Sequence, residues 1–181
     1  MALVTLSLGS NIEPAANVRQ AVKALRERHG EVRVSPVYES EAVGFSGANF
    51  LNLVVALEVS GGLEELAREL KELEQLQGRD RSAGSFAART LDVDILTYDA
   101  LQGDFGGIQL PRPEITRYAF VLQPLADLLP DARHPVLDKS YRQLWQEFRD
   151  NAAQEQRLWQ VPFDWDLSTG PRSPDGERMI P

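Results

Sequence analysis

The chain has 181 residues, of which 43% are hydrophobic and 25% charged, a composition typical of one globular domain with a substantial core. Twenty-seven acidic residues against nineteen basic ones give a formal net charge of -8, which disfavours non-specific binding to nucleic acid or anionic membranes. The absence of cysteine excludes disulfides, thiolate metal ligands and cysteine nucleophiles. Since no segment resembles a signal peptide or approaches the ~20 apolar residues of a membrane span, we expect a cytoplasmic protein.

The first half of the chain alternates between strand and helix patterns. Apolar residues at every second position predict strands over 3–8, 32–38, 51–59 and 91–96. Amphipathic helices are predicted between Pro14 and Gly30 and between Gly62 and Gly78. The order strand, helix, strand, strand, helix, strand predicts an α+β fold with a ferredoxin-like βαββαβ core, a largely antiparallel sheet and both helices on one face. Pro36 suggests that the second strand lies at an edge of the sheet.

The second half of the chain predicts less regular structure. Residues 99–113 contain three glycines and two prolines, which indicate a loop or a short hairpin. Ser140 can cap a C-terminal helical extension with a stripe of large apolar side chains. We expect one domain over 1–160 and a Pro/Gly-rich tail over 161–181. The predicted core residues are Val4, Leu6, Leu8, Val22, Leu25, Val55, Leu57, Leu66, Leu70 and Ile95.

Two aspartates in the fourth strand are the sharpest chemical signal. Asp92 and Asp94 are two positions apart, which places both carboxylates on one face of a strand, ~7 Å apart at Cα. Aspartate is disfavoured in strands, and two like charges ~4 Å apart repel by roughly 4 kcal/mol at an effective dielectric constant near 20. A divalent cation between them would reverse that cost, and hard oxygen ligands favour Mg²⁺. The alternative is a pair of ordinary acids on a strand facing solvent.

A basic loop precedes these acids. Arg79, Arg81 and Arg89 all lie within fifteen positions of Asp92 and Asp94. Guanidinium groups fit phosphate oxygens, so arginines beside a metal pair favour phosphoryl, pyrophosphoryl or nucleotidyl transfer. A solvated basic loop without a phosphate ligand is the alternative.

Weaker candidates lie on other elements. Asn52 has a carboxamide that can read the donors and acceptors of a heterocycle, or it can be a satisfied inner polar residue. Phe50 and Phe120 are stacking platforms or, more commonly, core residues. His29 and His134 have no carboxylate partner in their local sequence, which disfavours a catalytic role for them.

Several short motifs together carry a family resemblance over about residues 1–155. They are Gly9-Ser10-Asn11, Phe50-Leu51-Asn52, Gly78-Arg79, Arg89-Thr90-Leu91-Asp92-Val93-Asp94-Ile95 and Phe120-Val121-Leu122-Gln123-Pro124-Leu125. In this order and spacing they resemble the 6-hydroxymethyl-7,8-dihydropterin pyrophosphokinases of folate biosynthesis. The resemblance implies a ferredoxin-like sheet and transfer of the terminal diphosphate of ATP to the pterin hydroxymethyl oxygen, with release of AMP.

The resemblance also implies roles for individual residues. Two Mg²⁺ ions would be held by Asp92 and Asp94, with ATP as co-substrate, and Arg81 and Arg89 would stabilise the charge that builds on the transferred group. The pterin would be sandwiched by Phe50 and Phe120, read by Asn52, and contacted by the backbone of Val43 and Gly44. Nucleotide contacts would come from Arg79, Arg81, Arg89, Ile95, Arg112 and Tyr118. We expect a monomer that binds these small molecules and neither nucleic acid nor a membrane.

The sequence departs from the family pattern on the nucleotide side. Ser85-Phe86 and Ala88 stand where the family has a second Arg-Trp pair and a proline, Arg112 replaces a histidine, and Tyr118 replaces an arginine. A catalytically weakened paralogue that binds pterin or nucleotide without turnover is therefore the main alternative. A palm-like nucleotidyl transferase is a further alternative, because paired aspartates on a sheet also suit that reaction.

Overall fold

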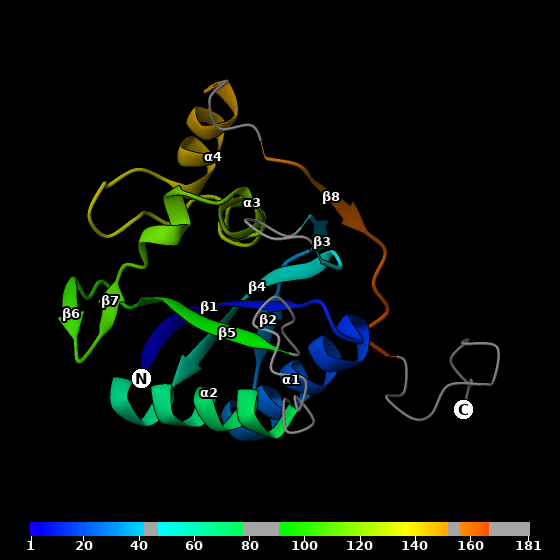
Figure 1. Cartoon of the computed structure of the whole chain (residues 1–181). Coiled ribbons are helices and arrows are strands. Elements are labelled where there is room, and N and C mark those ends of the chain that lie inside the picture. The colour runs from blue at the N-terminus through cyan, green and yellow to red at the C-terminus, as the bar shows by residue number, and fades with distance from the viewer. Residues whose placement is uncertain (42–46, 78–90, 152–155, 167–181) are drawn as a thin grey trace.

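The computed structural model describes residues 1–41, 47–77, 91–151 and 156–166, and Figure 1 shows how their elements are arranged. The elements in chain order are β1 (Ala2–Ser10), α1 (Pro14–His29), β2 (Val32–Val34), β3 (Val37–Ser40), β4 (Phe50–Val59), α2 (Leu63–Gln77), β5 (Asp92–Tyr98), β6 (Gly103–Phe105), β7 (Ile108–Leu110), the 3-10 helix η1 (Pro113–Thr116), α3 (Ala119–Leu128), α4 (Tyr141–Asp150) and β8 (Leu158–Val161).

One antiparallel sheet organises the molecule. Its strand order is β5-β1-β4-β3-β8, with β2 also paired to β4, and every pair is antiparallel. The two strands at the centre, β1 and β4, are paired over nine residues each, from Ala2 opposite Val59 to Ser10 opposite Leu51. This arrangement confirms the predicted ferredoxin-like α+β fold.

The main core lies between the sheet and one helical layer. Helices α1 and α2 both cover the lower face of the sheet in Figure 1, as the sequence predicts. Their apolar stripes pack against alternate residues of the central strands, which are fully buried aliphatic side chains. All ten predicted core residues are buried, with at most 5% of their surface exposed.

The opposite face carries helices α3 and α4, of which the sequence predicts only the second. A separate apolar cluster forms there around Val54 of β4 and Leu96 of β5. The sequence assigns no element to 119–128, because Pro124 stands inside the apolar run, yet the helix continues through it. The predicted cap of α4 is confirmed, since the Gln143 amide donates to the Ser140 hydroxyl at 3.1 Å.

The predicted strand over 32–38 is divided into β2 and β3 at Ser35-Pro36. Proline has no N–H for the ladder. At the break, the Ser35 amide donates to the Val54 carbonyl at 2.9 Å, and the Ser35 hydroxyl accepts the Val54 amide at 2.9 Å. Of these two strands, only β2 lies at an edge, because β3 pairs with β4 on one side and with β8 on the other. Pro36 therefore indicates an edge correctly for β2 and wrongly for β3.

The C-terminal segment contributes to the sheet. Strand β8 pairs with β3 and ends at Val161, one residue beyond the predicted end of the domain. Phe163 and Trp165, which fall in the predicted tail, pack against the main core. The boundary at residue 160 stays a prediction, and residues 167–181 lie outside the described part of the chain. The predicted loop or hairpin over 99–113 is the β6-β7 hairpin.

Candidate active site

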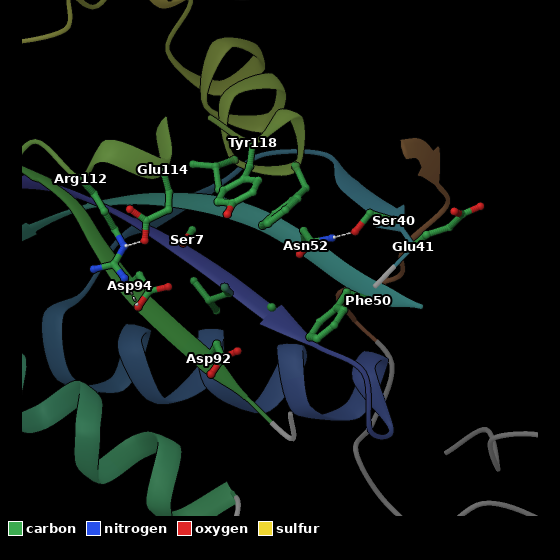
Figure 2. Close-up of a pocket in the computed structure, with 14 residues that line it drawn as sticks. Ser7, Ser40, Glu41, Phe50, Asn52, Asp92, Asp94, Arg112, Glu114 and Tyr118 are labelled. Carbon is green, nitrogen blue, oxygen red and sulfur yellow. Dashed lines mark hydrogen bonds and ion pairs between the residues drawn. The ribbon is translucent and has the colours of Figure 1, made fainter. Parts of the chain in front are cut away.

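A cavity of about 280 Å³ opens between α3 and the sheet face that α1 and α2 leave uncovered. Its walls come from β1, the ends of β3 and β4, β5, η1 and the start of α3 (Figure 2). The lining residues are Ser7, Leu8, Gly9, Ser40, Glu41, Phe50, Asn52, Asp92, Asp94, Arg112, Glu114, Tyr118, Phe120 and Val121.

Strand alternation delivers the two aspartates to this cavity. Asp92 and Asp94 both line it, whereas Val93 between them is 6% exposed and belongs to the main core. Figure 2 shows both carboxylates on the same side of β5, below η1. The predicted common face is confirmed, and it is the face on which the cavity lies.

Arg112 and Glu114 surround the second aspartate. The Arg112 Nη2 lies 3.4 Å from Asp94 Oδ1, and its Nε lies 3.0 Å from Glu114 Oε2 (Figure 2). The second contact is an ion pair whose angle is too poor for a hydrogen bond. Burial raises the pKa of Asp94, the Arg112 guanidinium lowers it, and the Glu114 carboxylate raises it, for a net increase. One guanidinium is thus shared by two carboxylates at this end of the cavity.

The other end of the cavity combines an amide with aromatic rings. Asn52 is only 5% exposed, and its Nδ2 donates to the Ser40 hydroxyl at 2.8 Å. The rings of Tyr118 and Phe120 stack with centroids 5.0 Å apart and planes 22° from parallel. Phe50 lines the same end from the start of β4, as Figure 2 shows. This end can hold a flat heterocycle and read its polar edge.

Gly9 makes room for the amide. It pairs with Asn52 across β1 and β4, and a Cβ built on Gly9 would lie 3.3 Å from Asn52 Oδ1. A side chain at this position would press on the carboxamide, so glycine keeps the floor of the cavity open.

A second cavity, of about 170 Å³, lies between α2, β5 and β7. We refer to it as the small cavity and to the cavity of about 280 Å³ under α3 as the large cavity. Asp94 and Arg112 line both cavities, so the two spaces share a wall. Ile95, a predicted nucleotide contact, lines the small cavity and is 5% exposed in the core. Glu74 of α2 also lines it and accepts the Val93 amide at 2.8 Å. Burial is the main cause that raises the pKa of Glu74.

The structure thus brings together many of the predicted site residues. Those that line the large cavity are Phe50, Asn52, Asp92, Asp94, Arg112, Tyr118 and Phe120. Val43, Gly44, Arg79, Arg81 and Arg89 lie outside the described residues. The sequence analysis missed Ser40, Glu74 and Glu114, because only tertiary structure brings these side chains to the cavities.

Both histidines lie away from the lining of the large cavity. His29 Nε2 contacts the Glu69 carboxylate of α2 at 2.8 Å, a partner that no local pattern reveals. His134 Nδ1 accepts the amides of Val136 and Leu137 at 3.2 and 3.1 Å and holds its own loop. Neither contact is with a residue that lines the large cavity.

The described residues contain no cluster of three or more His, Asp or Glu side chains arranged around a metal position. None of the described helices combines the length and the apolar character that a membrane span requires.

Comparisons with known proteins place the chain in a family. The sequence profile of the 7,8-dihydro-6-hydroxymethylpterin-pyrophosphokinases (HPPK) matches residues 5–130. A protein of Aquifex aeolicus named 2-amino-4-hydroxy-6-hydroxymethyldihydropteridine pyrophosphokinase is 32% identical over 151 residues, which cover 82% of this chain and 91% of the relative. The protein of the same name from Pseudomonas aeruginosa is 39% identical over 137 residues, which cover 73% of this chain and 83% of that one.

A solved structure shares the fold. Wild-type HPPK-DHPS of Plasmodium falciparum superposes with a TM-score of 0.65 at 13% identity. The match covers 81% of this chain but only 44% of that protein, so this chain spans less than half of its length. At this identity the likeness concerns the fold alone. On the profile and the two bacterial relatives, the chain belongs to the 7,8-dihydro-6-hydroxymethylpterin-pyrophosphokinase family.

Proposed function

We propose that this chain carries out the reaction of its family in the cavity under α3. The family transfers diphosphate from ATP to 6-hydroxymethyl-7,8-dihydropterin in folate biosynthesis. The pterin hydroxymethyl oxygen bonds to the β-phosphorus while the bond from that phosphorus to the α–β bridging oxygen breaks. AMP leaves with the bridging oxygen, and the hydroxyl proton is released. The observation that carries the proposal is one cavity with paired carboxylates at one end and an amide with aromatic rings at the other.

The carboxylate end fits Mg²⁺. This ion binds through one or two carboxylates together with substrate phosphates and water rather than in a cage made by protein alone. Two aspartates on one face of β5 match that pattern. Asp92 and Asp94 would hold the two expected ions, which would supply neutralisation of phosphate charge and polarisation of the phosphoryl oxygens.

The small cavity is the proposed binding site of the nucleotide. It adjoins the large cavity at Asp94 and Arg112, and its lining includes Ile95. A nucleotide in this cavity would direct its phosphates toward Asp94, with Arg112 at the junction. Tyr118, also a predicted nucleotide contact, lies on the side of Glu114 that faces away from Arg112 (Figure 2). Arg79, Arg81 and Arg89 remain predicted phosphate contacts, of which Arg81 and Arg89 would stabilise the transferring group.

The aromatic end of the large cavity is the proposed binding site of the pterin. Phe50 and Phe120 reach this end from β4 and α3, so a flat ring can lie between them. The carboxamide of Asn52 can pair with the donor and acceptor edge of the ring, and its bond to Ser40 fixes its orientation. Backbone contacts from Val43 and Gly44 stay predictions.

One observation favours the alternative of a weakened paralogue. Arg112, which stands where the family has a histidine, pairs with Asp94, an expected metal ligand. A guanidinium beside this carboxylate competes with a cation for it. Such a protein would bind pterin or nucleotide without turnover. The palm-like nucleotidyl transferase of the sequence analysis has no support from the family match.

The test is AMP formation from ATP, Mg²⁺ and 6-hydroxymethyl-7,8-dihydropterin, with Asp92→Asn/Asp94→Asn as the blank. We expect release that requires the pterin and both aspartates, with at least a ~1,000-fold loss in the blank, as for removal of a metal site. Pterin binding without AMP release from the wild-type chain would instead establish the binding module. Gel filtration with light scattering tests the predicted monomer, and the predicted cytoplasmic location rests on the sequence alone.

A further inference from the structure

The Gln156 side chain joins the C-terminal segment to the start of α3. Its Oε1 accepts the Ala119 amide at 2.8 Å, and its Nε2 donates to the Arg117 carbonyl at 2.8 Å. One carboxamide thus satisfies a backbone donor and a backbone acceptor two residues apart. The reversed amide would place a donor against a donor and an acceptor against an acceptor, so these partners fix its orientation.

This contact caps α3 from 37 positions away along the chain. Ala119 is the first residue of α3, and the first amides of a helix have no partner within it. Tyr118 holds the N-cap position with extended backbone, at φ -125° and ψ 126°, and its side chain makes no capping hydrogen bond. Gln156 therefore supplies an acceptor for the amide of the first helical residue, whereas a serine or aspartate at the N-cap would accept from the second or third.

The capped backbone carries the aromatic wall of the cavity. Arg117 and Ala119 flank Tyr118, and Phe120 follows directly. The two rings stack on each other and both line the large cavity. A change of the backbone angles at Tyr118 would turn both rings relative to the sheet. The hydrogen bonds from Gln156 therefore help to set the distance between these rings and Asn52, which is the width of the space for a flat ring.

The residues after Gln156 contact the opposite wall. Leu158 begins β8 and pairs with Ser40 of β3, and the Ser40 hydroxyl accepts the Asn52 carboxamide. Three consecutive residues, 156–158, therefore reach the backbone that carries the aromatic rings and the strand that orients the amide. This short segment therefore contacts both walls of the cavity. It lies beyond residues 5–130, the part of the chain that the family profile matches.

We propose that Gln156 is a positioning residue for the pterin. It touches none of the lining side chains through its own amide, and it acts by holding the 117–119 backbone at the distance from Asn52 that a ring requires. The proposal rests on the proposed function, because it takes the ligand of the aromatic end to be the pterin.

The experiment compares Gln156→Ala and Gln156→Met with the wild-type chain, using 6-hydroxymethyl-7,8-dihydropterin as the probe. We expect pterin binding about ten-fold weaker in both variants, from two lost hydrogen bonds, and a matching rise in KM for the pterin. We expect kcat to change less than about three-fold, because the aspartates on β5 are untouched. Gln160→Ala removes the same type of side chain from an exposed position of β8 and is the matched control, with no change expected.

A third variant separates the two hydrogen bonds. Gln156→Glu keeps an acceptor for the Ala119 amide and loses the donor to the Arg117 carbonyl, so part of the lost affinity should return relative to Gln156→Met. Amide hydrogen exchange of a peptide over 117–122 should be faster in the Ala and Met variants and near the wild-type rate in the Glu variant.

Three outcomes would overturn the proposal. Unchanged pterin affinity in the Ala and Met variants would show that the cap has no bearing on the ring slot. A fall in kcat in proportion to the folded fraction, with KM unchanged, would show a purely structural role. A Glu variant as weak as the Met variant would show that capping of the Ala119 amide does not set pterin affinity, and the proposed positioning through α3 would fail. If the wild-type chain binds no pterin, the proposed function fails instead, and hydrogen exchange still reports whether Gln156 caps α3.

Discussion

The two faces of the sheet differ in how completely they are covered. The face under α1 and α2 is filled by buried aliphatic side chains, whereas the face under α3 is covered over only part of its length and leaves the large cavity. The same strands serve both faces. In β5, Val93 enters the core and Asp92 enters the cavity. Core packing and the polar side chains of the cavity are therefore separated by a single residue along the strand.

The largest expected effect lies on the packed face. Leu25 of α1 is 0% exposed, and Leu25→Ala should lower the free energy of unfolding by about 3 kcal/mol, from lost burial and the cavity left behind. Urea unfolding measures the loss, and turnover per folded molecule should stay at the wild-type value. A folded variant with impaired turnover would show that the two faces are coupled.

The next effect lies in the cavity. Asn52→Ala should weaken pterin binding by about 30-fold, or about 2 kcal/mol, because the heterocycle loses its hydrogen-bonding partner. Ser40→Ala removes only the support of the amide and should cost about three-fold. Calorimetric titration with the pterin compares the two variants. Equal losses would mean that Asn52 acts through its orientation alone.

A third effect concerns the charges around Asp94. Removing the guanidinium with Arg112→Gln should raise the pKa of Asp94, because Arg112 lowers it. Removing the carboxylate with Glu114→Gln should lower the pKa of Asp94, because Glu114 raises it. Carboxyl carbon shifts in the metal-free protein, followed against pH, measure both changes. Shifts in the same direction in the two variants would contradict the pairing seen at this end of the cavity.

The smallest effect concerns a loop outside the cavity. Burial lowers the pKa of His134, so the unfolded chain binds more protons than the folded one as pH falls below about 6.5. The stability that neutral His134 contributes is therefore present above that pH and lost below it, by less than about 1.4 kcal/mol per pH unit. In His134→Asn, the free energy of unfolding, measured between pH 7 and pH 5, should therefore fall less steeply with decreasing pH than in the wild-type chain. An unchanged slope would show that His134 is not the titrating group.

Local periodicity predicted the packed face well. The strand and helix patterns of the first 98 residues identify the ferredoxin-like order and all ten core residues that we named. Each of these patterns shows which side of one helix or strand faces the core. A few neighbouring residues are enough to determine that side. The break at Ser35-Pro36 was missed because the contact at this point, the Val54 amide donating to the Ser35 hydroxyl, joins residues 19 positions apart.

The cavity face could be predicted only in part. Strand alternation places Asp92 and Asp94 on one face, and the structure confirms it. That Asn52 lines the same cavity follows only from the strand register, in which Gly9 pairs with both Asn52 and Asp92. Helix α3 and strand β8 were missed, because a proline interrupts the pattern of the first and the second is four residues long. Ser40 and Gln156 act through partners that are distant in sequence, and Glu114 influences Asp94, 20 positions away, only because the fold brings them together. No local pattern therefore reveals these three residues.

The shared wall of the two cavities has a thermodynamic consequence. Asp94 and Arg112 line both spaces, so any ligand that moves the Arg112 guanidinium changes the electrostatic environment of the neighbouring cavity as well. With the nucleotide and the pterin in these two cavities, as we propose, their binding equilibria would be linked. Such linkage is reciprocal: the factor by which a nucleotide alters pterin affinity must equal the factor by which pterin alters nucleotide affinity. The order in which the two molecules arrive can set the rates of binding, but it leaves that factor unchanged.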